Sequence, residues 1–175
     1  DIVRERPDLA GLSNHFEIID EKEADRILIS AAQSWLHANS GFLQDFTDPE
    51  VDLSRSRQAR NGWQDLAVTI AKNYIRQSKD MQFMPEIIQD HLNGLTSHQP
   101  LLSMGYEIFK DYQRALHYRS AVDFDDLIRL ALQVLESDPG DEGYLTRLRF
   151  RWPFILEDEA QDSSNNQQKI LRLLS

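Results

Sequence analysis

The chain has 175 residues, 41% hydrophobic and 27% charged, which is typical of a globular protein with one core or a small domain plus part of another. Its net charge of −10 argues against tight DNA binding by these residues alone, because nucleic-acid affinity depends on neutralising phosphates with lysine and arginine. The absence of cysteine excludes disulfide frameworks and thiolate metal sites, and no apolar run is long enough to span a membrane. No signal-peptide pattern opens the sequence, so we expect a soluble protein of the cytoplasm.

Both ends of the sequence have the character of internal boundaries. The chain starts at Asp1 rather than at a methionine, and Ile170 to Ser175 stop inside an apolar helical pattern. We therefore expect these residues to be an internal piece of a longer protein.

Most of the chain is predicted to be helical. Asp20–Glu23 forms a capping-box pattern, and the apolar residues behind it recur at helical spacing until Asn39–Gly41. A polar, irregular stretch follows over 41–60, where we expect a long loop. Pro85 suits the first turn of a later helix. In chain order, we expect helices over residues 20–39, 63–75, 85–92, 101–116 and 123–136.

The last of these helices has the best-defined start. Asp123 fits the N-cap position and Asp126 fits N3, while Val122 and Leu127 occupy the two hydrophobic-staple positions. The helix should end before Ser137–Asp141, the strongest cluster of helix-breaking residues in the chain. We place a domain boundary there, with a helical unit over 1–139 and a second unit over 140–175.

The pattern changes after this boundary. A short helix over 144–149 leads into Trp152–Leu156, the one convincing candidate for a buried strand. Pro153 is acceptable there because the start of a strand tolerates its missing N–H. Ser164–Gln167 forms another capping box and should open a last helix. The expected fold is therefore mainly α, with one strand-helix unit after the helical unit.

Two adjacent carboxylates, those of Asp158 and Glu159, follow the predicted strand. The strand would place them at its carboxyl edge, where open α/β sheets bind ligands. In nucleotide-hydrolysing motors an aspartate at this edge holds Mg²⁺, and a neighbouring acid orients or deprotonates the attacking water. For an Asp-Glu pair taken alone, an acidic loop before a helix N-terminus is the better explanation, because the helix dipole favours carboxylates.

Residues 158–162 read Asp-Glu-Ala-Gln-Asp and match motif II, the D-E-x-Q-D form of the Walker B box in UvrD/Rep-type superfamily 1 DNA helicases. Residues 121–127 (AVDFDDL) resemble the V-D-F-x-x-L segment that precedes motif II in that family. Residues 75–85 (IRQSKDMQFMP) resemble its I-x-x-x-K-[ND]-x-x-x-x-P segment, and residues 11–20 resemble its G-L-x-x-x-F-x-I-x-D lead-in. The resemblance covers almost the whole chain, loosely in its first third and tightly from 121 onwards.

The resemblance implies roles for the residues of motif II, the name kept below for Asp158–Asp162. Asp158 would coordinate Mg²⁺, and Glu159 would bind the nucleotide as the catalytic base for ATP hydrolysis. Gln161 and Asp162 would couple the nucleotide state to neighbouring motifs, while Gln167 matches a family glutamine with a structural role. Residues 1–139 would form the helical subdomain 1B, and residues 140–175 would be part of the RecA-like subdomain 1A that holds ATP.

Three departures from the family pattern bear on what these residues can do alone. Glu157 stands where the family usually has an apolar residue. None of the five lysines is followed by serine or threonine, so the phosphate-binding loop G-x-x-x-x-G-K-[ST] does not occur in these 175 residues. The later family motifs, with the arginines that reach the γ-phosphate, are missing as well. We expect ATP and Mg²⁺ to be bound by the whole protein and the isolated piece to be inactive.

A weaker signal is a basic strip of Lys72, Arg76 and Lys79 on the second helix. Subdomain 1B can contact duplex DNA in the family, so this strip is a candidate phosphate contact. An ordinary solvated face explains the same residues, and the sequence favours that interpretation.

Three hypotheses follow for the whole protein. The first is an ATP-driven DNA helicase or translocase acting at single strands and duplex junctions, with a 3′-to-5′ direction implied by the resemblance alone. The second is a helicase-nuclease subunit of the same superfamily, which shares motif II. The third is a non-enzymatic helical protein-interaction domain with a decayed motor signature. Because the predicted strand would lack neighbours here, we expect it to be displaced or to pair between chains.

Overall fold

The computed structural model describes residues 2–42, 46, 57–94, 99–137 and 143–175, with the backbone alone for 57–61. This part of the chain is mainly helical, which confirms the predicted class, and none of its helices is both long and apolar enough to cross a membrane. Its α-helices are, in chain order, α1 (Ile2–Glu5), α2 (Glu21–Ala38), α3 (Arg57–Asp80), α4 (Pro85–Asn93), α5 (Pro100–Tyr118), α6 (Phe124–Glu136), α7 (Tyr144–Arg151) and α8 (Asn165–Leu174). Its shorter elements are the strands β1 (Glu17–Ile18) and β2 (Ala121–Val122) and the 3-10 helix η2 (Ala160–Asp162).

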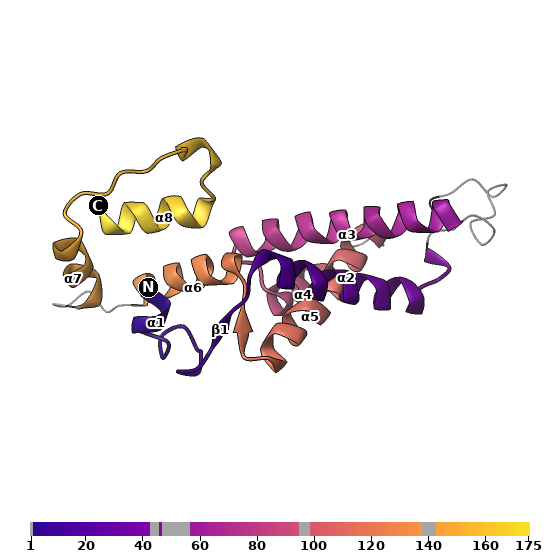
Figure 1. Cartoon of the computed structure of the whole chain (residues 1–175), viewed down its shortest axis with the longest axis horizontal. Coiled ribbons are helices and arrows are strands. Elements are labelled where there is room, and N and C mark those ends of the chain that lie inside the picture. The colour runs from indigo at the N-terminus through magenta and orange to yellow at the C-terminus, as the bar shows by residue number, and fades with distance from the viewer. Residues whose placement is uncertain (1, 43–45, 47–56, 95–98, 138–142) are drawn as a thin grey trace.

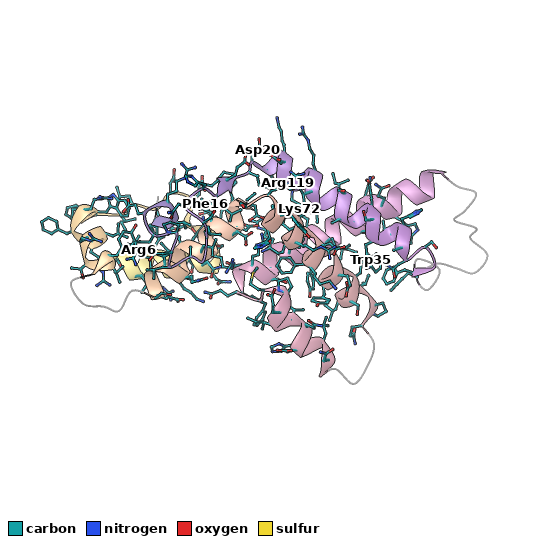
Figure 2. All side chains as sticks on the ribbon, turned by 90° about the horizontal axis from the view of Figure 1, so that it is seen from below. Arg6, Phe16, Asp20, Trp35, Lys72 and Arg119 are labelled. Atoms are coloured by element: carbon teal, nitrogen blue, oxygen red, sulfur yellow. The ribbon has the colours of Figure 1, made fainter. Side chains whose placement is uncertain are left out.

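The molecule is elongated, with one group of helices at each end (Figure 1). One group contains α2, α3, α4 and α5, and the other contains α1, α6, α7 and α8. Each group has its own cluster of buried hydrophobic side chains. The end of α3 reaches α6 and so connects the two groups. Arg6 and Trp35 lie toward opposite ends of the molecule (Figure 2).

The two clusters divide the helices differently from the predicted boundary, of which residues 138–142 lie outside the described part of the chain. Leu130 and Val134 of α6 precede that boundary, yet they are buried together with Val3 of α1 and Leu148 of α7. The first helix and the last three therefore share one core, and α2 to α5 build the other.

Side-chain caps fix the starts of α2 and α6 at the predicted N-cap residues, although the carboxylate of Glu23, expected to complete a capping box, pairs with Arg119 instead. Asp20 accepts a hydrogen bond from the backbone N–H of Glu23 at 2.8 Å. Asp123 accepts one from the backbone N–H of Asp126, also at 2.8 Å. Each carboxylate satisfies an N–H group that has no partner inside its own helix.

The close contact between α3 and α5 depends on a glycine. A Cβ atom at Gly105 would lie 2.7 Å from the ring of Tyr74, which is closer than any real Cβ contact. Gly105 therefore lets the tyrosine ring rest directly on the backbone of α5, at the cost in helix propensity that glycine carries.

A short parallel ladder joins the two groups of helices. Glu17 pairs with Ala121 and Ile18 with Val122, and the N–H of Ile19 donates to the carbonyl of Val122 at 3.0 Å. The sequence did not predict these strands, because two residues are too few to show an alternating pattern. The ladder brings together two of the segments that carry the family resemblance, 11–20 and 121–127.

The strand predicted at Trp152–Leu156 is absent, and this part of the prediction is wrong. Phe154 is 90% exposed and Leu156 is 97% exposed, and neither belongs to a ladder. A strand needs a neighbour to pair its N–H and C=O groups. The described part of the chain offers no such neighbour at this position.

A buried ammonium group joins the end of α3 to the start of α6. Lys79 is 1% exposed, and its Nζ lies 2.5 Å from Oδ2 of Asp123 and 2.9 Å from Oδ2 of Asp126. Tyr112 of α5 donates its hydroxyl to the same oxygen of Asp123 at 2.6 Å. These four side chains, called the Lys79 cluster below, connect three helices through charge-assisted hydrogen bonds.

The charges of this cluster are compensated by their neighbours. Burial disfavours ionisation of Asp123, but the Lys79 ammonium and the Tyr112 hydroxyl outweigh it and hold the pKa of Asp123 below its usual value. Burial and the adjacent carboxylates raise the pKa of Tyr112, so its hydroxyl keeps its proton and remains a donor. Arg129 lies 3.6 Å from Asp126 and supplies a second positive charge.

We expect Lys79→Ala to lower the free energy of unfolding of the 175-residue chain by about 3–5 kcal/mol, because it leaves two carboxylates buried without their cation. Urea unfolding followed by circular dichroism measures the change. Lys22→Ala is the matched control, since Lys22 is an exposed helical lysine, and it should change stability by less than about 0.5 kcal/mol.

The difference between Lys79→Ala and the parent should also depend on pH. The folded pKa of Asp123 is lowered, so its contribution is present above the unfolded value of about 3.9 and is lost as pH falls through the folded pKa. The difference should therefore shrink below about pH 4. A constant difference from neutral to strongly acidic pH would contradict the ionic origin of the stabilisation.

Candidate functional site

Motif II lies on an exposed loop between α7 and α8, and all five of its side chains are exposed. Oδ1 of Asp158 accepts a hydrogen bond from the backbone N–H of Glu159 at 3.0 Å. The side-chain amide of Gln161 donates to the carboxylate of Glu159, and the N–H of Asp162 donates to the carbonyl of Glu159 at 2.8 Å. Within the described chain, the hydrogen bonds of residues 157–162 stay inside 157–163, so the loop holds its own shape.

The backbone of Glu159 is left-handed, with φ 55° and ψ 42°. This conformation is uncommon for a residue with a side chain and costs about 1–2 kcal/mol. Backbone strain of this kind is concentrated at functional sites, where the surrounding structure maintains it. Gln82 and Ser120 have the same left-handed backbone shortly after the ends of α3 and α5, so the conformation at Glu159 is consistent with a functional loop but does not by itself identify one.

The helix after motif II is capped by other residues. The hydroxyl of Ser164 accepts from the N–H of Gln167 at 3.3 Å, and the Gln167 side chain accepts from the N–H of Ser164 at 2.8 Å. Asp80 accepts from the N–H groups of Asn165 at 3.3 Å and Asn166 at 3.1 Å. The predicted capping box is confirmed. Because these groups occupy the start of α8, capping of that helix does not account for the two acids of motif II.

Asp158 and Glu159 offer hard oxygen donors of the kind that Mg²⁺ prefers. This cation takes one or two protein carboxylates and completes its octahedron with water and phosphate oxygens. No three acidic, histidine or cysteine side chains gather into a cation site anywhere in the described residues. The donor set therefore fits Mg²⁺ that arrives with a nucleotide phosphate and does not fit a cation held by this chain alone.

A cleft of about 450 Å³ opens beside the end of motif II. It is lined by Arg76 of α3, Asp125 of α6 and Asp162 of motif II, among others. Burial and the nearby Asp123 raise the pKa of Asp125, and the positive charge of Arg76 opposes that rise. The cleft thus brings a side chain of motif II to the surface between α3 and α6.

The predicted basic strip on α3 is only partly available to a ligand. The structure places Lys79 inside the Lys79 cluster, so its ammonium cannot reach a phosphate. The side chain of Lys72 is half exposed, and hydrogen bonds to Asp25 at 2.8 Å and Glu21 at 3.3 Å raise the pKa of its ammonium. Arg76 is exposed, and no described hydrogen bond or ion pair occupies its guanidinium group.

A signal for the burial of Lys79 is present in the sequence. Ala67, Ala71 and Ile75 are buried at four-residue spacing along α3, and Lys79 is the next position of the same row. The prediction instead grouped Lys79 with Lys72 and Arg76 on a solvated face of the helix, so its burial was missed. Its partners in α6 are 44 and 47 residues further along the chain.

Comparison with known proteins gives the relatives of this chain. The model of the UvrD/REP helicase N-terminal domain family matches residues 1–175. The ATP-dependent DNA helicase UvrD1 of Mycobacterium tuberculosis is 38% identical over 92 residues, which are 51% of this chain and 12% of that protein. The ATP-dependent DNA helicase PcrA of Staphylococcus epidermidis is 25% identical over 174 residues, 99% of this chain and 20% of that protein.

A third relative has a second activity in its name. This ATP-dependent helicase/nuclease protein of Bacillus pumilus is 31% identical over 141 residues, which are 75% of this chain and 10% of that protein. The chain therefore spans between a tenth and a fifth of the length of these curated relatives.

We expect Ser164→Ala to lower the free energy of unfolding by about 1 kcal/mol, the usual effect of losing a serine N-cap. Its hydroxyl caps α8 directly after motif II, so the loss should also make the N–H of Gln167 exchange faster with solvent. Urea unfolding and amide hydrogen exchange measure the two effects. Ser34→Ala, at an exposed site within α2, is the control and should leave stability unchanged or slightly raised. Equal effects of the two changes would contradict the cap.

Proposed function

Because this chain belongs to the UvrD/REP helicase N-terminal domain family, we propose that the whole protein is an ATP-dependent DNA helicase or translocase. The names of the UvrD1 and PcrA relatives support a DNA helicase in the coarse sense. We further propose movement in the 3′-to-5′ direction and action where single-stranded DNA meets duplex. These finer statements rest on the family resemblance of motif II and its upstream segments.

The proposal rests on the exposure and the contacts of the two acids of motif II. Asp158 and Glu159 are exposed, and in the described chain they form no ion pair and do not cap α8. Their described partners lie within the loop itself, the N–H of Glu159 for Asp158 and the amide of Gln161 for Glu159. Each carboxylate therefore keeps lone pairs that can bind a cation or a water molecule.

The proposed mechanism assigns one task to each side chain. Bound Mg²⁺ would neutralise charge on the β- and γ-phosphates of ATP. Asp158 would bind that cation through its carboxylate. Glu159 would accept the proton of the attacking water, and Gln161, which donates its amide to the Glu159 carboxylate, would orient this base.

The division into subdomains is also a proposal. By resemblance, residues 1–139 correspond to the helical subdomain 1B and residues 140–175 to part of the RecA-like subdomain 1A. The separate core of α2 to α5 supports a helical unit. The shared core of α1, α6, α7 and α8 departs from that division, and on this ground we propose that α1 and α6 belong with motif II and that α2 to α5 form the helical unit.

DNA contacts are proposed for the exposed part of the strip on α3. Arg76 is the stronger candidate, because it forms no described hydrogen bond or ion pair and shares its cleft with Asp125 only at longer range, whereas Lys72 is paired with two acids. A contact by these side chains would be to phosphate and would position DNA without reading its sequence.

A helicase-nuclease subunit is the second candidate function, favoured by the match to the Bacillus pumilus protein over 75% of this chain. Motif II would serve both proteins in the same way. Incubating the complete protein with labelled linear DNA, Mg²⁺ and ATP separates the two, since only a nuclease would shorten the strands.

In the complete protein we expect Asp158→Asn to weaken Mg-ATP binding and ATPase activity together, because a neutral amide is a poor ligand for a hard cation. Glu159→Gln should leave Mg-ATP binding nearly intact and lower turnover by about a hundredfold or more, the typical contribution of a general base. Steady-state ATPase rates beside equilibrium nucleotide binding measure both changes.

Glu136→Gln is the control for this pair, since Glu136 is an exposed acid at the end of α6, and it should retain the parent rate. If Glu159→Gln hydrolyses ATP as fast as the parent protein, the motor function proposed for motif II is wrong. Neither change in motif II should alter the unfolding midpoint by more than a few degrees, because both side chains are exposed.

For residues 1–175 alone we expect no measurable ATP binding or hydrolysis, because no phosphate-binding loop occurs among them. Calorimetric titration with Mg-ATP tests this directly. Micromolar affinity would contradict the prediction and would show that these residues hold the nucleotide without that loop.

A further inference from the structure

Two neighbouring residues at the end of α3 hold the starts of two different helices. The ammonium of Lys79 binds Asp123 and Asp126 in the first turn of α6. The carboxylate of Asp80 binds the first turn of α8, which begins 85 residues further along the chain. The end of α3 is therefore the point where the helical body meets the helix that follows motif II.

Asp80 uses both of its oxygens. Oδ2 accepts hydrogen bonds from the backbone N–H of Asn165 at 3.3 Å and from its side-chain amide at 2.7 Å. Oδ1 accepts from the backbone N–H of Asn166 at 3.1 Å. Partial burial opposes ionisation, but these donors hold the pKa of Asp80 below its usual value. The ionised carboxylate also faces the positive end of the α8 dipole.

A second set of contacts at the same junction involves Asn166, which is 2% exposed. Its side-chain amide donates to the backbone carbonyl of Lys79 at 3.0 Å, and its oxygen accepts from the amide of Gln82 at 3.5 Å. We call the contacts of Asp80 and Lys79 with Asn165 and Asn166 the Asp80 clamp. It fixes the first turn of α8 in position as well as in direction.

The clamp is close to motif II along the chain. Only Ser163 and Ser164 separate η2, which contains the last residues of motif II, from the first residue of α8. On the other side of motif II, Phe154 and Leu156 are exposed and belong to no ladder in the described residues. The described hydrogen bonds of motif II itself stay within 157–163. The Asp80 clamp is thus its nearest attachment to the helical body within the described chain.

We propose that Asp80 is a positioning residue for ATP hydrolysis: by holding the first turn of α8 against the end of α3, it sets where the carboxylates of Asp158 and Glu159 stand. The inference rests on the ATPase function proposed for motif II. Asp80 itself does not touch the nucleotide and acts through α8. Any shift of α3 relative to the rest of the chain is passed to motif II through the same contacts.

The first test measures the clamp without reference to activity. In the 175-residue chain, Asp80→Ala removes the acceptor of two backbone N–H groups, so hydrogen exchange at Asn165 and Asn166 should accelerate about tenfold or more. Asp80→Asn keeps one acceptor oxygen and should give an intermediate rate. Asp90→Ala, at an exposed aspartate in α4 with no described partner, is the control and should leave both amides unchanged.

The second test measures positioning in the complete protein. Asp80→Ala should lower kcat for ATP about tenfold or more, because a displacement of about 1 Å at a catalytic group is enough for such losses. The KM for ATP should change much less than kcat, since the other groups that bind the nucleotide are untouched. Asp80→Asn should restore part of kcat, and Asp90→Ala should behave as the parent.

The outcomes separate this inference from the proposed function. If Glu159→Gln abolishes turnover while Asp80→Ala keeps the parent kcat, the positioning role is overturned and the function stands. If kcat falls but the amides of Asn165 and Asn166 exchange as in the parent, the route through α8 is overturned. If Glu159→Gln keeps the parent rate, the proposed function fails and the positioning role fails with it. Faster exchange with a lower kcat and partial rescue by Asp80→Asn supports the inference.

Discussion

A lysine ammonium that water cannot reach constrains the rest of this structure. Removing an ammonium and two carboxylates from water costs several kcal/mol for each ion, so they remain charged only where their mutual contacts replace the lost hydration. Lys79 meets that condition through Asp123 and Asp126 of α6, with Tyr112 of α5 filling a further acceptor position. Hydrogen bonds between these groups are directional, unlike apolar contacts. The relative placement of α3, α5 and α6 is therefore fixed more tightly than apolar packing alone would fix it.

The placement of Lys79 also affects the candidate site, because the next residue in the chain, Asp80, contacts α8. Asp80 follows Lys79 directly, so once the lysine is anchored in α6 the aspartate has little freedom, and its carboxylate is presented to the first turn of α8. The start of α6 carries carboxylates, which bind the ammonium of Lys79. The start of α8 presents N–H groups without partners inside the helix, and these donate to the carboxylate of Asp80. The Lys-Asp pair thus matches the different charges of two neighbouring helix starts. The position of motif II therefore depends on the contacts of Lys79 with α6 and of Asp80 with α8.

The sequence predicted what is encoded locally. The caps at Asp20, Asp123 and Ser164 depend on residues within one helical turn, and all three form as predicted. The strand at Trp152–Leu156 was predicted wrongly, because an apolar run signals a strand only when another segment pairs with it. The fold of the candidate site depended on contacts between residues far apart in the chain. A single sequence gives no direct signal for the pairing of Lys79 with α6 or of Asp80 with α8, although the four-residue row on α3 pointed to the burial of Lys79.

The net negative charge of the chain does not conflict with the proposed action on DNA. The surroundings of the individual basic residues of α3 show why. Of the three cations predicted as a strip, Lys79 is buried in its cluster and Lys72 is paired with two acids of α2, so only Arg76 has no described ion pair. Each phosphate neutralised changes the salt dependence of binding by a slope of about 0.9, so one arginine contributes a weak and strongly screened contact. Under the proposed function, the α3 surface would guide DNA rather than hold it tightly. The contribution proposed for these residues is then to keep the carboxylates of motif II in place relative to that surface, through the contacts of Asp80 with α8.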